Sequence, residues 1–500
     1  MWPFKNKQSE PDTEQVQQRS RNHNYRPPAL NNPLQKRSKA TDFLSFESAN
    51  GAQINAVMRT RLPNVRTVSR GLMRENPYAK RYQQLTSDQT VGSQGISIKP
   101  VPLNRSGSIN VKLQTQLERA FYQWANNAVS FSGGSFTIDT FQQLCEKSRS
   151  QDGECLVLLN DDCTVSFIDP VQLPSNNNQK LNNGNYISQS IEYSPMGRVI
   201  AYHICQVDPV LNQLTGKYTR IPKDKVLHYF VMDNIGQERG LPDLVASIQA
   251  LANYDEYCNS TAIARKVSAA AMGFITSDNT SDIPLDDDED DYNETVEYFS
   301  PGSIFKLNPG ESIQALNAGQ VASDGIQEFS DIILQSIAAS LHISKEVLTG
   351  TSFSSYSAAR MALLLSKQVF RTRSNLLINQ VLIPLYEFWL KNFMLRNNMS
   401  FVNYDDIKQV QCSLPMNESL DPAKDGLHLK TLLDCGVQSR TSYLKEKGLN
   451  PEQIFSEIEN EREQFGIGVN KQETAKDTNT NGIESTTTKT DEGDQLNKQS

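Results

Sequence analysis

The 500-residue chain contains no long apolar run, only five histidines and no C-x-x-C pair. Its densest apolar cluster, residues 361–365, is far shorter than the roughly 18 residues that cross a bilayer, so we expect no membrane span. The segment WPFKNK after Met1 lacks the apolar core of a signal peptide, which predicts a cytoplasmic chain. Seven cysteines without metal-ligand spacing indicate reduced, mostly buried thiols.

The sequence also lacks the common enzyme motifs. It has no P-loop, H-E-x-x-H or G-x-S-x-G. The five histidines are scattered at His23, His203, His228, His342 and His428. We interpret His228, which has apolar neighbours, as a hydrogen-bonded structural histidine, with a catalytic role as the alternative. The sequence therefore predicts no enzymatic activity, no cofactor, and no catalytic or metal-binding residue.

The acidic run at residues 286–291 is a candidate for a divalent cation. It lacks the glycine and the alternating ligands of an EF-hand, and we interpret it as a solvated loop. A metal-dependent DNA-processing enzyme would need carboxylates from separate elements around two ions. Six consecutive carboxylates cannot all converge in this way, so we disfavour that enzyme.

Charge is distributed unevenly along the chain. Residues 1–80 carry 14 Lys+Arg and 6 Asp+Glu, a net charge of +8, and the remainder has a net charge of −16. Residues 1–45 are rich in Gln, Asn, Arg and Pro, which predicts a disordered basic arm, with nucleic acid or an acidic partner as possible contacts. Residues 467–500, rich in Thr, Asn, Lys and Gln, are predicted to form a disordered tail.

The first ordered part, residues 46–240, is predicted to be a helix-rich α+β domain. Asn76 followed by Pro77 favours a helix start, and this helix is expected to end near Gly92. Further helices are expected around residues 113–128 and 141–145, an extended segment near 96–98, and strands at 155–159, 163–168, 186–193, 199–207 and 225–231.

The second half is predicted to be mainly helical, around a polar loop. A long helix is expected at residues 241–271, an excursion with a strand at 303–307 follows, and a helix starting near 325 ends near His342. That helix carries an apolar stripe at three- and four-residue steps. A last long helix is expected from Ser357 to Leu395, kinked at Pro384. The polar loop between these rods comprises Thr349, Gly350, Thr351, Ser352, Phe353, Ser354 and Ser355.

Three ordered motif blocks carry a family resemblance. The first, H-x-F…G-Q-x-R-G, comprises His228, Phe230, Gly236, Gln237, Arg239 and Gly240. The second, L-T-G…Y-S-S-A-R, comprises Leu348, Thr349, Gly350, Tyr356, Ser357, Ala359 and Arg360, with Ala358 in place of the second Ser. The third comprises Asp421, Pro422, Gly436, Gly448 and Glu452. Over about residues 70–466 the chain resembles the lambda-type portal proteins of tailed bacteriophages.

This resemblance implies a subunit of a homo-oligomeric ring. About twelve copies would surround a DNA channel at one capsid vertex, used for genome packaging, head-tail joining and DNA ejection. The implied parts are an α+β wing (46–240), stem helices (241–272 and 322–345), a clip (273–321), a tunnel loop (346–356), a long kinked helix (357–400) and C-terminal wing or crown helices (401–466). The loop would line the channel, supported by Tyr356 and Arg360.

The resemblance also implies partners and a location. Non-specific double-stranded DNA would pass through the ring, and the protein partners would be the terminase large subunit, the major capsid or scaffold protein, and a head-completion or connector protein. The clip residues implied are Pro301, Gly302, Asn308, Pro309 and Gly310. The chain would reside in the virion, after assembly in the host cytoplasm. A structural virion protein without a channel is the alternative.

The C-terminal helices argue against direct DNA binding. A helix-turn-helix would place a basic second helix against phosphate. Here the corresponding helix carries Glu452, Glu457, Glu459, Glu461 and Glu463, with Arg462 as its cation. We therefore expect these helices to pack within an oligomer.

Overall fold

The computed structural model describes ten parts of the chain. These are residues 53–104, 106–131, 134, 136–269, 273–277, 311–315, 325–399, 404–414, 422–446 and 451–465. The predicted N-terminal arm, C-terminal tail, acidic run and strand at 303–307 lie outside these residues, as do the implied clip residues. The chain divides into two units, Met1–Pro422 and Ala423–Ser500, which are described separately.

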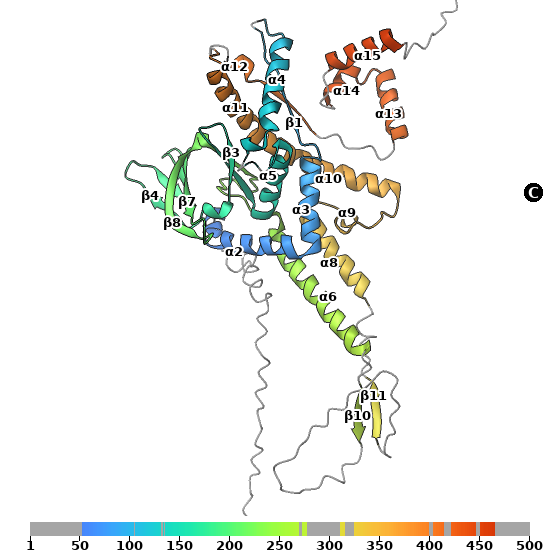
Figure 1. Cartoon of the computed structure of the whole chain (residues 1–500). Helices are drawn as coiled ribbons and strands as arrows, with labels where there is room; N and C mark the ends of the chain where they lie inside the picture. Colours follow the sequence, from blue (N-terminus) through green and yellow to red (C-terminus); the bar gives the residue numbers. More distant parts are fainter. Residues whose placement is uncertain are drawn as a thin grey trace, which may run out of the picture. The chain divides into compact units, whose positions relative to one another are not determined.

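Four helices open the described part of the first unit (Figure 1). They are α2 (Ile54–Glu75), α3 (Pro77–Thr90), α4 (Val111–Ala125) and α5 (Ile138–Asp152). The predicted start of α3 is confirmed, because the Asn76 side chain accepts hydrogen bonds from the backbone N–H groups of Tyr78 and Ala79. Helix α2 was not predicted from the sequence, and its interior contains Pro63, a helix breaker. Burial of Met58, Leu62 and Val65 on one face stabilises it nevertheless.

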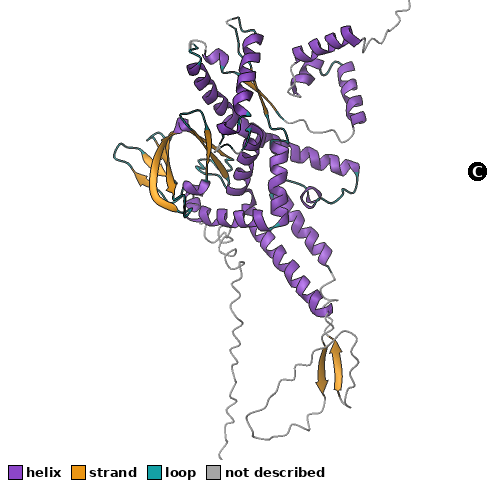
Figure 2. Ribbon diagram, viewed as in Figure 1, coloured by secondary structure: helices purple, strands orange, loops and turns teal. Residues whose placement is uncertain are grey.

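Two antiparallel sheets complete the predicted α+β domain (Figure 2). The three-stranded sheet has the order β3-β2-β9 and comprises β2 (Glu154–Leu159), β3 (Val165–Ile168) and β9 (Val226–Phe230). The five-stranded sheet runs in sequence order through β4 (Gln179–Lys180), β5 (Tyr186–Ser188), β6 (Ile191–Tyr193), β7 (Val199–Val207) and β8 (Leu214–Pro222). Two further pairs join β1 (Ser97–Pro100) to β12 (Val410–Ser413), and β10 (Gly273–Ser277) to β11 (Glu311–Ala315).

The single strand predicted at residues 186–193 is wrong. Gln189 and Ser190 have φ angles of 50° and 68°, in the left-handed region, so the chain turns back between β5 and β6. Tertiary hydrogen bonds hold this turn, including one from the Ser190 hydroxyl to the Pro174 carbonyl at 2.7 Å. Strand β8 was missed because its residues are polar and mostly exposed, without the alternation that marks a half-buried strand.

The long helices differ from prediction at their ends. They are α6 (Ile248–Ala269), α8 (Ile326–Ser340), α9 (Lys345–Thr349), α10 (Tyr356–Leu377) and α11 (Ile383–Arg396), and a short helix α12 (Tyr404–Ile407) follows. The expected helix start at Leu241 is wrong, because Pro242 is extended and Asp243–Ala246 forms a 3-10 turn. Helices α6 and α8 contact each other (Figure 1).

The interruption expected at Pro384 is a π-helical segment, Ile378–Leu382, just before the proline. Proline lacks an N–H group and its ring clashes with the carbonyl of the residue four positions earlier, so a wider turn relieves the conflict. The path from α10 into α11 is therefore nearly continuous, and α11 carries Leu385, Tyr386 and Trp389 into the largest apolar core. That core also contains Phe121 and Phe141 from α4 and α5.

A second core lies where α2, α3, α6, α8 and α9 meet. It contains Leu72, Tyr82, Leu251, Ile337 and Leu348. All seven cysteines are free thiols, four of them buried. No helix in the described part of the chain combines the length and apolar character that crossing a bilayer requires.

The C-terminal unit consists of short helices, as predicted. They are α13 (Pro422–Asp434), α14 (Arg440–Glu446) and α15 (Pro451–Phe465). Gly436, with a φ angle of 69°, follows α13 and allows the chain to turn. Helix α13 buries none of its side chains, and Leu427 and Phe455 are exposed apolar residues of the unit.

Candidate functional site

The predicted polar loop joins α9 to α10. Thr349 is the last residue of α9, and Gly350 follows it with a φ angle of 76°, so the loop itself is residues 350–355 rather than 346–356. The Gly350 N–H group donates to the Glu346 carbonyl at 2.8 Å, which is a common way to end a helix. Helix α10 begins at Tyr356, one residue earlier than predicted.

Side-chain hydroxyls organise both ends of the loop. Ser355 caps α10 by accepting a hydrogen bond from the Ala358 N–H at 3.2 Å. The hydroxyls of Thr349 and Thr351 lie 2.9 Å apart. Thr351, Ser352 and Ser354 are exposed and Phe353 is half-buried. The loop therefore presents hydroxyl groups to its surroundings and carries no charged side chain.

One residue that supports the loop was missed from the sequence. Arg81 of α3 donates from Nε to the Val347 carbonyl at 3.1 Å, and its guanidinium packs beside Gly350. No local pattern relates Arg81 to residue 347, so only the tertiary structure reveals the contact. Tyr356 and Arg360 are exposed at the start of α10, and their loop-supporting role remains a prediction.

Three residues of the first motif block, His228, Arg239 and Gly240, converge on one buried carboxylate, Glu154 of β2. Arg239 donates to it from Nε at 2.9 Å and also from Nη2, and Nε2 of His228 lies 3.0 Å from its Oε2 atom. The backbone N–H of Gly240 is 3.3 Å away, and Nη2 of Arg66 lies 2.8 Å from Oε1. Both Glu154 and Arg239 are completely buried. These motif residues thus belong to a structural ion cluster, which fits the structural interpretation of His228.

The electrostatics of this cluster favour an ionised Glu154. Burial alone would raise the pKa of its carboxyl, but the guanidinium groups of Arg239 and Arg66 hold it well below the usual range. Burial lowers the pKa of His228, although its hydrogen bond to Glu154 acts in the opposite direction. A charged carboxylate surrounded by cations stabilises the junction of α2, β2, β9 and the segment before α6.

Gln237, also in the motif, fixes the loop that follows β9. Its Oε1 atom accepts the N–H groups of Asp233 and Asn234, each at 3.0 Å, and its Nε2 donates to the Arg239 carbonyl at 2.7 Å. Asn55 of α2 holds the same loop from the other side by donating to the Gly236 carbonyl at 2.8 Å. Gln237 therefore sets the shape of residues 231–236.

A second buried ion cluster ties the base of α10 to the rest of the unit. Arg149 binds Asp243 through Nη1 at 2.8 Å and Glu146 through Nη2 at 2.7 Å. Arg373 of α10 reaches Asp243 at 3.4 Å and donates to the Tyr82 hydroxyl at 3.0 Å. The helix that leaves the polar loop is thereby connected to α3, to α5 and to the turn before α6.

We predict that Asp243 makes the free energy of unfolding depend on pH in the acidic range. Burial alone would raise its pKa, but Arg149 and Arg373 lower it from 3.8 to about 2. A lowered carboxyl pKa stabilises the folded state above the unfolded pKa, and this contribution disappears as the pH falls from about 3.8 to about 2. The contribution is about 2 kcal/mol. The difference in thermal midpoint between the wild type and Asp243→Asn should therefore be large at pH 6 and shrink toward pH 2. A constant difference across this range would contradict the assignment.

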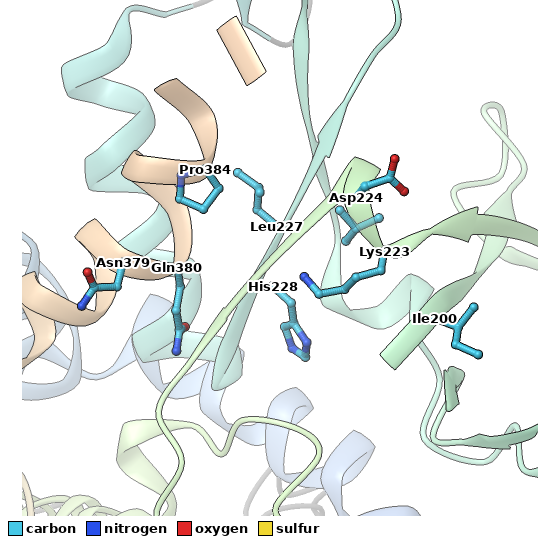
Figure 3. A pocket seen from close by; sticks show the side chains of 9 residues that line it. Ile200, Lys223, Asp224, Leu227, His228, Asn379, Gln380 and Pro384 are labelled. Atoms are coloured by element: carbon cyan, nitrogen blue, oxygen red, sulfur yellow. The ribbon is translucent and has the colours of Figure 1, made fainter. Parts of the chain in front are cut away.

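A pocket of about 460 Å³ opens beside the π-helical segment (Figure 3). Its walls include His228 and Leu227 of β9, Lys223 and Asp224 from the preceding turn, and Gln380 of the π-helical segment. The Oε1 atom of Gln380 accepts the N–H of Phe230 at 3.1 Å, which ties this segment to β9. Lys223 and Asp224 bring charges of opposite sign to the wall of the pocket. No group of three or more His, Cys, Asp or Glu side chains suited to a metal ion occurs among the described residues.

Comparison with known proteins gives consistent matches. The sequence model of the family described as "Phage portal protein, lambda family" matches residues 45–373. A probable portal protein of Halomonas phage phiHAP-1 is 24% identical over 407 residues, which cover 78% of this chain and 78% of that protein.

Two solved structures also resemble the chain. A protein of the virion of a native gene transfer agent particle shares 12% identity at a TM-score of 0.48, covering 78% of this chain and 94% of that one. An HK97-family phage portal protein from Corynebacterium diphtheriae shares 12% identity at a TM-score of 0.25, covering 58% and 81%.

Proposed function

The chain belongs to the lambda family of phage portal proteins, and from this we propose that it forms a ring of about twelve copies around a channel for double-stranded DNA. The ring would occupy one capsid vertex and serve genome packaging, head-tail joining and DNA ejection. The family match over residues 45–373, more than half of the chain, carries this proposal. The sequence-based assignment to this family is confirmed.

We assign parts of the fold to the proposed ring as follows. Helices α6 and α8, which contact each other, form the stem, and the antiparallel pair β10–β11 begins the clip. The loop at residues 350–355 lines the narrowest part of the channel. Its anchoring to α3 through Arg81 supports this role, because a loop that guides a moving polymer needs a fixed base.

The charge of the chain supports a channel that does not bind DNA tightly. The chain outside residues 1–80 has a net charge of −16, and many copies of such a body repel phosphate. The exposed hydroxyls of Ser352 and Ser354 can form hydrogen bonds to DNA but carry no positive charge that would retain it. DNA would therefore slide past the loop.

The proposed ring would work with other virion proteins. We propose the terminase large subunit as the packaging partner, the major capsid or scaffold protein as the partner during assembly, and a head-completion or connector protein as the partner afterwards. The protein would reside in the virion after assembly in the host cytoplasm.

The loop assignment can be tested by adding charge. Replacing Ser352 and Ser354 with lysine adds two cations per copy, roughly two dozen in a ring of twelve. DNA should then be retained in the channel with a steep salt dependence, because each phosphate contact releases counterions. Packaging and ejection should both slow, while electron microscopy should show normal rings, since the loop does not belong to the core.

A matched control places the same charges elsewhere. Leu211→Lys with Gln213→Lys adds two cations at the exposed hairpin between β7 and β8 and should leave DNA passage unchanged. Unimpaired ejection from rings with the lysine-substituted loop would place this loop away from the DNA path. Purified particles without an axial opening would instead favour the alternative, a structural virion protein without a channel.

A further inference from the structure

Helix α10 exposes an apolar stripe near the polar loop. Met361, Leu364 and Leu365 have exposed fractions of 61%, 57% and 65%. Leu364 and Leu365 follow Met361 by three and four residues, and all three lie on the helix face opposite the buried residues Phe370 and Ser374. Within the described residues of the first unit, this stripe therefore lies uncovered. We call these three residues the α10 stripe.

A second apolar surface lies on the loop after β9. Met232 is 59% exposed, and Ile235 is fully exposed. The backbone of their neighbours Asp233, Asn234 and Gly236 is nevertheless held in place by the side chains of Gln237 and Asn55. A rigid loop that presents an uncovered isoleucine is preorganised for binding, because little conformational entropy remains to be lost. We call Met232, Asp233 and Ile235 the β9 loop patch.

The two surfaces are complementary in charge. Helix α10 exposes Arg360, Lys367 and Arg371 and contains no acidic residue, whereas its fourth cation, Arg373, is buried against Asp243. The β9 loop patch contains Asp233, whose carboxylate takes part in no salt bridge or hydrogen bond in the part of the chain that the structure describes. Burial and the charge of Asp243 raise its pKa, although Arg149, Arg373 and His342 of the same subunit act in the opposite direction, and a further cation would stabilise its ionised form.

Ring symmetry requires two different surfaces of this kind. In a ring of identical copies related by rotation, each copy presents one surface to the copy ahead and another to the copy behind. We propose that the α10 stripe of one copy docks on the β9 loop patch of the adjacent copy, with Asp233 facing the cations of α10. This inference rests on the proposed ring, and its specific content is which surfaces meet. In this arrangement Gln237 holds the β9 loop patch in the conformation that docks.

Each surface can be disabled without touching the core. Leu364→Gln with Leu365→Gln removes the stripe and keeps good helix formers. Met232→Gln with Ile235→Gln removes the patch. Either pair should raise the protein concentration needed for half-maximal ring assembly at least about tenfold. Met196→Gln with Val210→Gln, at side chains that are 88% and 85% exposed, is the matched control and should assemble as the wild type does.

Mixing the two variants tests whether the surfaces meet each other. The stripe variant keeps an intact patch and the patch variant keeps an intact stripe, so an equimolar mixture can form one sound interface but cannot propagate it. Native mass spectrometry should therefore find heterodimers, which neither variant forms alone, and no rings. Two single substitutions test the charge contact. Asp233→Lys should impair ring assembly more than Asp233→Asn does, because the charged side chains of α10 are all cations.

The outcomes separate this inference from the ring itself. If the wild type forms rings and both double variants do so at the same concentration, the docking assignment is wrong and the ring stands. If both variants lose assembly but their mixture gives no heterodimer, each surface contacts another part of the adjacent copy, and the assignment again fails. A wild-type chain that stays monomeric under assembly conditions would overturn the proposed ring and the docking together. Circular dichroism of each variant confirms that the subunit has folded.

Discussion

Replacing Glu154 with glutamine should lower the free energy of unfolding by about 3–5 kcal/mol. The carboxylate is completely buried and compensates the buried cations Arg66 and Arg239. A neutral amide keeps the shape of the side chain but leaves two guanidinium groups in a low-dielectric interior without a counter-charge. Chemical denaturation of the purified subunit, with the midpoint followed by circular dichroism, measures the loss.

A surface carboxylate provides the control for this measurement. Asp161 forms a salt bridge with Lys225 at 2.7 Å, but its side chain is 86% exposed. Asp161→Asn should therefore change the free energy of unfolding by at most about 1 kcal/mol. Equal effects of the two substitutions would show that the Glu154 cluster does not stabilise the fold.

Replacing Gly240 with alanine should have a comparable or larger effect. A Cβ atom at this position would overlap the carbonyl group of Gly153 and lie 2.9 Å from the Phe230 Cβ atom. The obstacle is backbone, which cannot rotate away, so the segment before α6 would have to separate from the end of α5. We expect a loss of at least about 3 kcal/mol, seen as a lower thermal midpoint or as insoluble protein.

Gly71 is the matched control, because it also lacks a positive φ angle and has no atom within 4 Å of an added Cβ. It lies inside α2, where alanine favours the helix by about 0.5–1 kcal/mol. Gly71→Ala should therefore keep or raise the thermal midpoint. Comparable stability of Gly240→Ala and Gly71→Ala would mean that the close backbone approach at Gly153 is not required for folding.

Local signals in the sequence determined the start of α3, the α+β character of the first half, the pair of rods around a polar loop and the family itself. Asn76 and Pro77 act within one helical turn, and strand alternation acts over a few residues, so no distant contact was needed to predict them. The motif blocks identified the family because their order along the chain is a property of the sequence alone.

The tertiary structure decided what those motif residues do. Arg239 meets Glu154 across 85 positions of sequence, and Arg373 meets Tyr82 across 291, and no periodicity relates such pairs. Long-range packing also stabilises α2 despite Pro63 and bends the expected strand at Gln189. Local propensity is worth tenths of a kcal/mol per residue, whereas burying apolar side chains, or removing one partner of a buried ion pair, changes the free energy of unfolding by several kcal/mol. Tertiary contacts therefore prevail wherever the two disagree.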